Sequence, residues 1–159
     1  MAKTSFIATG DVFITRRVPE EGYEGFHALQ NCISSHDVAF TNLEMTFLRD
    51  EGIPNAVSGG TWASTDPVML DDMKRYGFNL FNTANNHSCD YSHSGVLATI
   101  RHLKERNMVF SGTGATLGEA SKPCAATKPW LTGSSRCAPP LMCRLRPPIP
   151  AAEARIFPT

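Results

Sequence analysis

The 159-residue chain has no excess of charge of either sign, because 15 basic residues balance 15 acidic ones. A general nucleic-acid-binding protein normally carries a basic surface, so this class is disfavoured. No run of about 18 apolar residues occurs, and the sequence therefore predicts no membrane span. The opening MAKTSFIATGD reaches Asp11 before any long apolar stretch, which argues against a secretory signal and favours a cytoplasmic location.

The cysteines show no spacing that is typical of a known site. The chain has five cysteines, an odd number, without zinc-finger spacing, so neither a disulfide framework nor a structural zinc site is indicated. By contrast, 42% of the residues are hydrophobic, which excludes disorder of the whole chain. The length suits a single domain.

The composition changes abruptly near Lys122. Residues 1–122 hold 10 basic and 14 acidic residues, whereas residues 123–159 hold 5 basic residues, 1 acidic residue and 8 of the 11 prolines. Paired prolines such as Pro139-Pro140 exclude a regular helix or a central strand there. We therefore predict a folded domain over 1–122 and an irregular tail over 123–159, truncated or out of frame. A genuine proline-rich binding tail is the alternative.

Short apolar runs alternate with amphipathic stretches in the first segment. Strands are predicted at residues 5–9, 38–42, 78–83 and 109–111. Helices are predicted at 24–35, from Asp66-Pro67 to Gly77, and from Ser94 to residue 107, with Asp66 and Ser94 as caps. This order predicts an α/β fold with a mainly parallel sheet flanked by helices.

Polar residues follow three successive predicted strands: Gly10-Asp11, Asn42-Leu43-Glu44, and Asn85-Asn86-His87 with Asp90 close behind. The carboxyl ends of neighbouring parallel strands meet at one rim of a sheet. Carboxylates, an amide and an imidazole suit divalent Mn, Fe or Zn, which can activate water against a phosphoester. Taken singly, each residue is more simply a turn, a cap or a solvated side chain. Their coincidence at three strand ends favours a site.

A family resemblance sharpens this interpretation. The segments TGDVFITRR, DVAFTNLEMTF and NLFNTANNHSCDYS, in this order, resemble the bacterial capsule-synthesis family (CapA, poly-γ-glutamate synthesis) over about residues 4–123. The resemblance implies a metallophosphatase-like α/β/β/α sandwich, of which this chain would form the N-terminal half. It also implies a role in capsule or poly-γ-glutamate production, in a family grouped with metal-dependent phosphoesterases.

The resemblance assigns roles to individual residues. Asp11, Glu44 and Asn86 match metal ligands, for one or two divalent ions of Mn, Fe or Zn. His87 matches the histidine that assists phosphate chemistry, and Asp90 matches a supporting acid.

Arg16 and Arg17 follow the first motif. One of them is expected to meet an anionic polymer or a phosphorylated small substrate, because a guanidinium binds phosphate and carboxylate well. A solvated loop end explains the pair equally well. The four other histidines are predicted to be surface residues: His27, His36, His93 and His102.

The chain also departs from the family pattern. Phe13 stands where many metallophosphatases have a ligand histidine, and no histidine follows Cys124, so the family's later ligand segments are missing. We expect weak metal binding and an apolar sheet face without its covering layer, which favours self-association. Whether the chain is an active enzyme therefore stays open. A non-catalytic remnant that binds a polymer or partner is the alternative, and a nucleotide-binding domain ranks last because GDVFITRR is not a glycine-rich phosphate loop.

Overall fold

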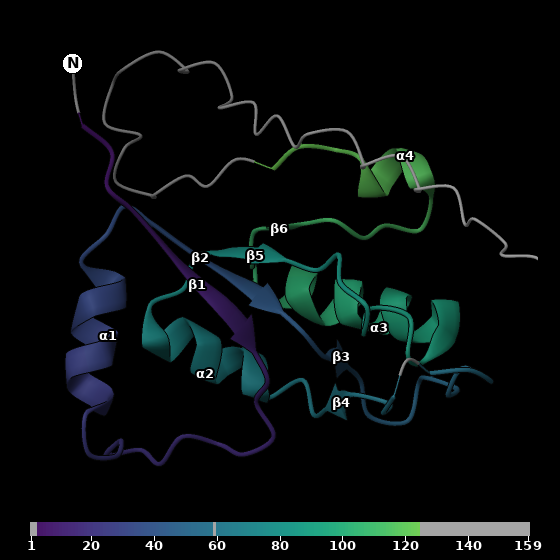
Figure 1. Ribbon diagram of the computed structural model, residues 1–159, viewed down its shortest axis with the longest axis horizontal. Coiled ribbons are helices and arrows are strands. Elements are labelled where there is room, and N and C mark those ends of the chain that lie inside the picture. The colour runs from purple at the N-terminus through teal and green to yellow at the C-terminus, as the bar shows by residue number, and fades with distance from the viewer. Residues whose placement is uncertain (1–2, 59, 125–159) are drawn as a thin grey trace, which may run out of the picture.

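The structure is a computed structural model that describes residues 3–58 and 60–124. The elements follow in chain order (Figure 1): β1 (Phe6–Val12), α1 (Phe26–Ser34), β2 (Val38–Leu43), β3 (Thr46–Phe47), β4 (Ser64–Thr65), α2 (Met69–Tyr76), β5 (Leu80–Asn82), α3 (Ser92–Glu105), β6 (Phe110–Ser111) and α4 (Leu117–Ala120). The predicted tail falls almost wholly outside the described residues. None of the described helices is long and apolar enough to cross a membrane.

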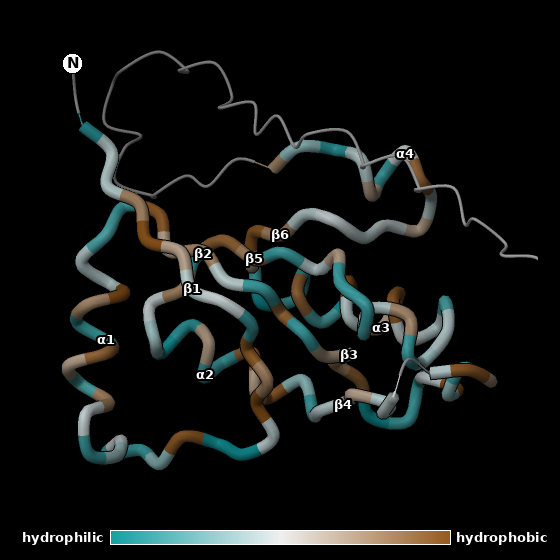
Figure 2. Tube along the Cα trace, in the orientation of Figure 1, coloured by the Kyte–Doolittle hydropathy of each residue, from teal (hydrophilic) through white to brown (hydrophobic). Residues whose placement is uncertain are grey.

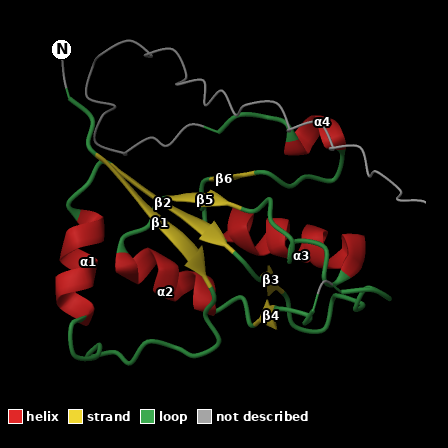
Figure 3. Ribbon diagram, in the orientation of Figure 1, coloured by secondary structure: helices red, strands yellow, loops and turns green. Residues whose placement is uncertain are grey.

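The main sheet has four strands in the order β1-β2-β5-β6, and every neighbouring pair is parallel. Figure 3 shows these strands side by side, with α2 lying between α1 and α3. The predicted α/β fold with a parallel sheet flanked by helices is thereby confirmed. Because each crossover leads to the next strand in the same direction, right-handed connections place all three crossover helices on one face of the sheet.

The hydrophobic core lies between this face and the helices. It joins Ala39 and Phe81 of the sheet to Ile33, Leu70 and Leu103, one residue from each of α1, α2 and α3. All five are nearly inaccessible to solvent. Figure 2 shows apolar residues in the neighbouring strands β1, β2 and β5.

The opposite face of the sheet is only partly covered. Phe6 is 59% exposed there, and its ring stacks on that of Phe40 with 6.5 Å between centroids. Phe6 is in register with Val38, and Phe40 is in register with Leu80, so all four residues share this face. Val38 and Leu80 are half-buried. Strand alternation therefore leaves an apolar face opposite the helices.

Several local expectations were wrong. β1 does not end at Gly10-Asp11 but runs on to Val12, with an irregular register between Ala8 and Asp11. Ser94 is the third residue of α3 and not its cap; its hydroxyl donates to the Tyr91 carbonyl at 3.1 Å. The short pair β3–β4 was not predicted, because two-residue strands show no alternation to detect.

His102 is also placed differently from the prediction. Only 9% of this residue is exposed, and its ring nitrogens contact the carboxylates of Glu51 at 2.9 Å and Glu105 at 3.2 Å. The imidazole thus ties the loop after β3 to α3. Asp66 behaves more nearly as expected: its carboxylate accepts from the Val68 N–H at 2.8 Å, just before α2 begins.

Candidate functional site

Three strands end together at the carboxyl edge of the sheet, and their polar side chains form a continuous row. Asp11 of β1 is in register with Asn42 of β2, which is in register with Asn82 of β5. The Asn42 side chain donates from Nδ2 to the Asp11 carboxylate at 2.7 Å, and the Asn82 side chain donates from Nδ2 to Asn42 Oδ1 at 2.7 Å. This row follows from parallel pairing, because in-register residues point to the same face.

Glu44 joins the row just beyond β2. Its carboxylate lies 3.4 Å from the Asn42 amide nitrogen that also serves Asp11. Two hydrogen bonds hold the pKa of Asp11 below its ordinary value. The one from Asn42 has the larger effect, and the one shared with Glu44 has the smaller. The same Asp11–Glu44 interaction, with burial, raises the pKa of Glu44. Two carboxylates therefore lie side by side: the charged form of Asp11 is favoured, and the charged form of Glu44 is disfavoured.

The loop after β5 is held against this row by Asn85. Its amide nitrogen donates to the Leu43 carbonyl at 2.7 Å and to the Asn42 side chain at 3.2 Å, while its own oxygen accepts from the His87 N–H at 3.0 Å. Asn85 thus forms the turn that presents the following residues. Asn86, the predicted metal ligand, is exposed and makes no hydrogen bond with any residue that the structure describes.

His87 and Asp90 form a close pair at the start of the next turn. The Nδ1 atom of His87 lies 2.8 Å from an Asp90 carboxylate oxygen that also accepts from the Ala63 N–H at 2.6 Å. Only 4% of Asp90 is exposed. Since an ionised carboxylate can only accept a hydrogen bond, Nδ1 carries the hydrogen in this contact. Nε2 is therefore available to contact other groups.

Two further contacts set the position of His87. The Thr46 hydroxyl donates to its carbonyl oxygen at 3.1 Å, and the Phe13 ring meets the imidazole edge-on with 6.3 Å between centroids. When protonated, His87 is near enough to Glu44 to favour the ionised form of that carboxyl. The structure therefore brings Asp11, Glu44 and His87 to one region of the rim.

The two arginines after β1 have different surroundings. Arg17 donates from Nε to Asp72 at 2.7 Å, and Asp72 is fully buried. The same carboxylate accepts from the Val18 N–H at 3.1 Å and from Arg75 at 3.2 Å. Arg16 is exposed and makes no ion pair with any described residue. Of the predicted pair, Arg17 is thus engaged in holding its own loop to α2.

The donors at the rim fit a divalent ion as a partial ligand set. Adjacent carboxylates with a nearby imidazole are the oxygen and nitrogen donors that Mn, Fe and Zn accept. In the described part of the chain, however, no three side chains of His, Cys, Asp or Glu are close enough together to hold a metal ion. Asp11 and Glu44 can therefore supply two ligands, with the remaining positions left to water or to other groups.

Sequence reasoning placed Asn42 and Asn85 at strand ends but gave them no role, and it missed Asn82 as a member of the site. Asn82 could have been found, because it lies near the end of a predicted strand and parallel strands of similar length align their ends. The choice between Asn85 and Asn86 depends on how the loop turns, which neighbouring residues do not reveal.

Residues 5–133 match the family model of the bacterial capsule synthesis protein PGA_cap. Two proteins of Sinorhizobium fredii (strain NBRC 101917 / NGR234), described as uncharacterized proteins y4sH and y4uA, are each 33% identical to this chain over 121 residues. The alignment covers 74% of this chain and 26% of each relative, so the chain matches about a quarter of their length.

Proposed function

The chain belongs to the family of the bacterial capsule synthesis protein PGA_cap, and from this premise we propose that its rim is a metal-dependent phosphoesterase-like site of capsule or poly-γ-glutamate production. The substrate class is a phosphorylated small molecule or an anionic polymer. The relationship to metallophosphatases is part of the proposal. Its main support is the His87–Asp90 contact of 2.8 Å beside the Asp11–Glu44 carboxylates.

His87 is suited to act as a general acid. In its protonated form, Nε2 can give its hydrogen to the oxygen that leaves phosphorus, while water adds to phosphorus and the phosphorus–oxygen bond breaks. Asp90 fixes the ring through its 2.8 Å contact with Nδ1. The Ala63 N–H keeps that carboxylate in place at 2.6 Å.

Asp11 and Glu44 are the residues that would hold a divalent ion, with Asn86 as the third proposed ligand. When bound, such an ion would polarise a phosphoryl oxygen and lower the pKa of water. Since the described residues offer only a partial ligand set, we further propose that the remaining ligands come from another segment or another chain. Binding by this chain alone is then expected to be weak.

The test compares metal content and hydrolysis in matched variants of the purified chain. Loaded with Mn²⁺ or Zn²⁺, the protein should cleave diphenyl phosphate, whose leaving oxygen requires a proton, unlike that of a p-nitrophenyl ester. Asp11→Asn should lower the bound metal. His87→Asn and Asp90→Asn should keep the metal but slow hydrolysis by roughly 10²–10⁴-fold, the usual size of a general acid's contribution.

His93→Asn is the matched control, since this exposed histidine lies six residues along the same stretch and should leave both readouts unchanged. Equal hydrolysis by His87→Asn and the control would contradict the proposed acid.

A binding module for an anionic polymer or a protein partner is the second candidate. The observation that favours it is the lack, among the described residues, of three close metal-binding side chains. A folded protein that takes up no metal and cleaves no phosphodiester would support this candidate over the enzyme.

A further inference from the structure

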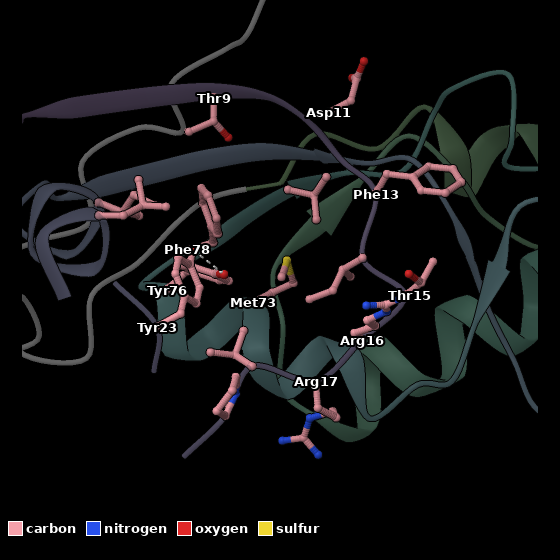
Figure 4. A pocket seen from close by; sticks show the side chains of 16 residues that line it. Thr9, Asp11, Phe13, Thr15, Arg16, Arg17, Tyr23, Met73, Tyr76 and Phe78 are labelled. Atoms are coloured by element: carbon pink, nitrogen blue, oxygen red, sulfur yellow. Dashed lines mark hydrogen bonds between the residues drawn. The ribbon is translucent and has the colours of Figure 1, made fainter. Parts of the chain in front are cut away.

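A pocket of about 530 Å³ lies on the helix-facing side of β1. It is an open pocket bordered by the end of β1, the segment after it (residues 13–19), α1 and α2 (Figure 4). Its size falls in the range of small-molecule sites, which runs from about 300 to 1,000 Å³. The pocket adjoins the rim site at Asp11 and Phe13, although the Asp11 carboxylate points away from the other labelled residues (Figure 4).

The walls of the pocket are mainly apolar and come from three elements: Ile14, Leu29, Ile33, Met73, Tyr76 and Phe78. Ile33 and Met73 are each only 1% exposed, so the inner end is formed by the core itself. The hydroxyls of Tyr23 and Tyr76 lie 3.0 Å apart and bond to each other. Burial raises the pKa of Tyr76, and this wall therefore stays uncharged.

The charge at the pocket comes from Arg16. Arg17 also lines the pocket, but its guanidinium is bound to the buried Asp72. Arg16 has no ion pair with a described residue, and Asp11, the only acidic residue of the lining, points outward. The pocket therefore combines an apolar interior with one guanidinium that is free to bind an anion. A guanidinium is suited to both carboxylate and phosphate groups.

We propose that this pocket binds an anionic amphiphile, with the hydrocarbon part against the walls formed by residues 13–19, α1 and α2, and a carboxylate or phosphate head group at Arg16. The mainly apolar walls disfavour a free inorganic anion as the preferred ligand, since apart from the arginines they offer it few hydrogen-bond donors. The free guanidinium selects an anionic head over a neutral one. The proposal does not depend on the phosphoesterase proposal, because it involves neither metal nor His87.

The experiment is a calorimetric titration of the full chain with four probes in the presence of EDTA. The probes are decanoate, decyl phosphate, decanol and inorganic phosphate, each below its aggregation limit. We expect 1:1 binding of the two anionic amphiphiles, weaker binding of decanol and none of inorganic phosphate. EDTA keeps the rim site free of metal, so the result is independent of the proposed activity.

Three variants separate the two parts of the pocket. Arg16→Gln should weaken decanoate binding about tenfold, equivalent to ~1.4 kcal/mol, and leave decanol unchanged. Leu29→Asp places a charge in the apolar wall and should weaken the binding of both decanoate and decanol. Leu29 is 44% exposed, so we expect the fold to tolerate the change. Lys104→Gln removes one positive charge from an exposed position of α3 and serves as the control.

Several outcomes would overturn the proposal. Equal affinities for decanoate and decanol would contradict the proposed role of Arg16. Inorganic phosphate binding as tightly as decyl phosphate would remove the role of the apolar walls. Absence of binding by the folded protein, or an equal loss in Lys104→Gln and Arg16→Gln, would reject the site altogether.

Discussion

Asp72 is the residue on which the segment after β1 depends most directly. It is fully buried and accepts hydrogen bonds from Arg17, Val18 and Arg75, which belong to two separate parts of the chain. A buried carboxylate without such partners would be strongly unfavourable. Its position explains why one of two adjacent arginines is engaged in the fold while the other stays available.

We expect Asp72→Asn to lower the free energy of unfolding by about 2–3 kcal/mol at neutral pH, the usual effect of losing hydrogen bonds to a charged group. Urea unfolding followed by circular dichroism measures this. The exposed Asp50→Asn is the control and should change stability by less than about 0.5 kcal/mol. A similar loss in both variants would contradict the assigned role.

The same carboxylate predicts a dependence of stability on pH. Burial tends to raise the pKa of Asp72, but Arg17, the Val18 N–H and Arg75 together outweigh it and lower the pKa below its ordinary value of 3.8. The folded state therefore binds this proton less tightly than the unfolded state. Its contribution is present above about pH 4 and is lost as the pH falls through the lowered value. The stability difference between wild type and Asp72→Asn should accordingly shrink below pH 4.

The junction of α1 and α2 depends on a glycine that ends α2. Gly77 has a φ of 98°, and a Cβ there would lie 2.8 Å from the Ser34 Cβ and 3.0 Å from its Cα, at the end of α1. The left-handed conformation ends the helix without strain only for glycine. The backbone of α1 cannot move away cheaply, since the helices share one core.

Gly77→Ala should therefore destabilise the protein by roughly 1–3 kcal/mol, from the left-handed backbone and the contact with α1. Gly118→Ala in α4 is the matched control, because its Cβ would meet only the Thr116 hydroxyl oxygen at 3.8 Å. That change should be neutral or slightly stabilising, since alanine favours a helix. Thermal unfolding compares the two, and equal melting temperatures would contradict the prediction.

Within the described part of the molecule, helices cover one face of the sheet and the other face is only partly covered. The helices bury one side, whereas Phe6, Val38, Phe40 and Leu80 remain exposed or half-buried on the other. Contiguous apolar surface of this kind promotes association. The sequence predicts self-association through this apolar face, and the structure leaves it a prediction.

We expect the protein to form oligomers as its concentration rises, and Phe6→Thr to shift it toward the monomer. Threonine keeps the preference for a strand, so the fold should be retained. Sedimentation velocity measures the distribution. Val57→Thr, at a loop residue that is 79% exposed, is the control. A wild-type protein that stays monomeric throughout, or an equal effect of the control, would contradict the prediction.

The sequence by itself determined the alternation of strands and helices, the parallel sheet, the family and the placing of polar residues at strand ends. These follow from local periodicity and chain order. Asp11, Asn42 and Glu44 reach one rim because parallel strands end on the same side. Their roles as ligands, with Asn86, and the catalytic roles of His87 and Asp90 remain predictions.

Only the tertiary structure decided which of several similar residues is engaged. It placed Asn85 rather than Asn86 against β2, bound Arg17 rather than Arg16 to Asp72, and buried His102 between two carboxylates. The main partners in these cases, Leu43, Asp72 and Glu51, lie more than 40 positions away along the chain. Contacts between residues so far apart in the sequence leave no local pattern, because only folding brings the two segments together. For the same physical reason, neither the pocket beside Arg16 nor the short β3–β4 pair could be read from neighbouring residues.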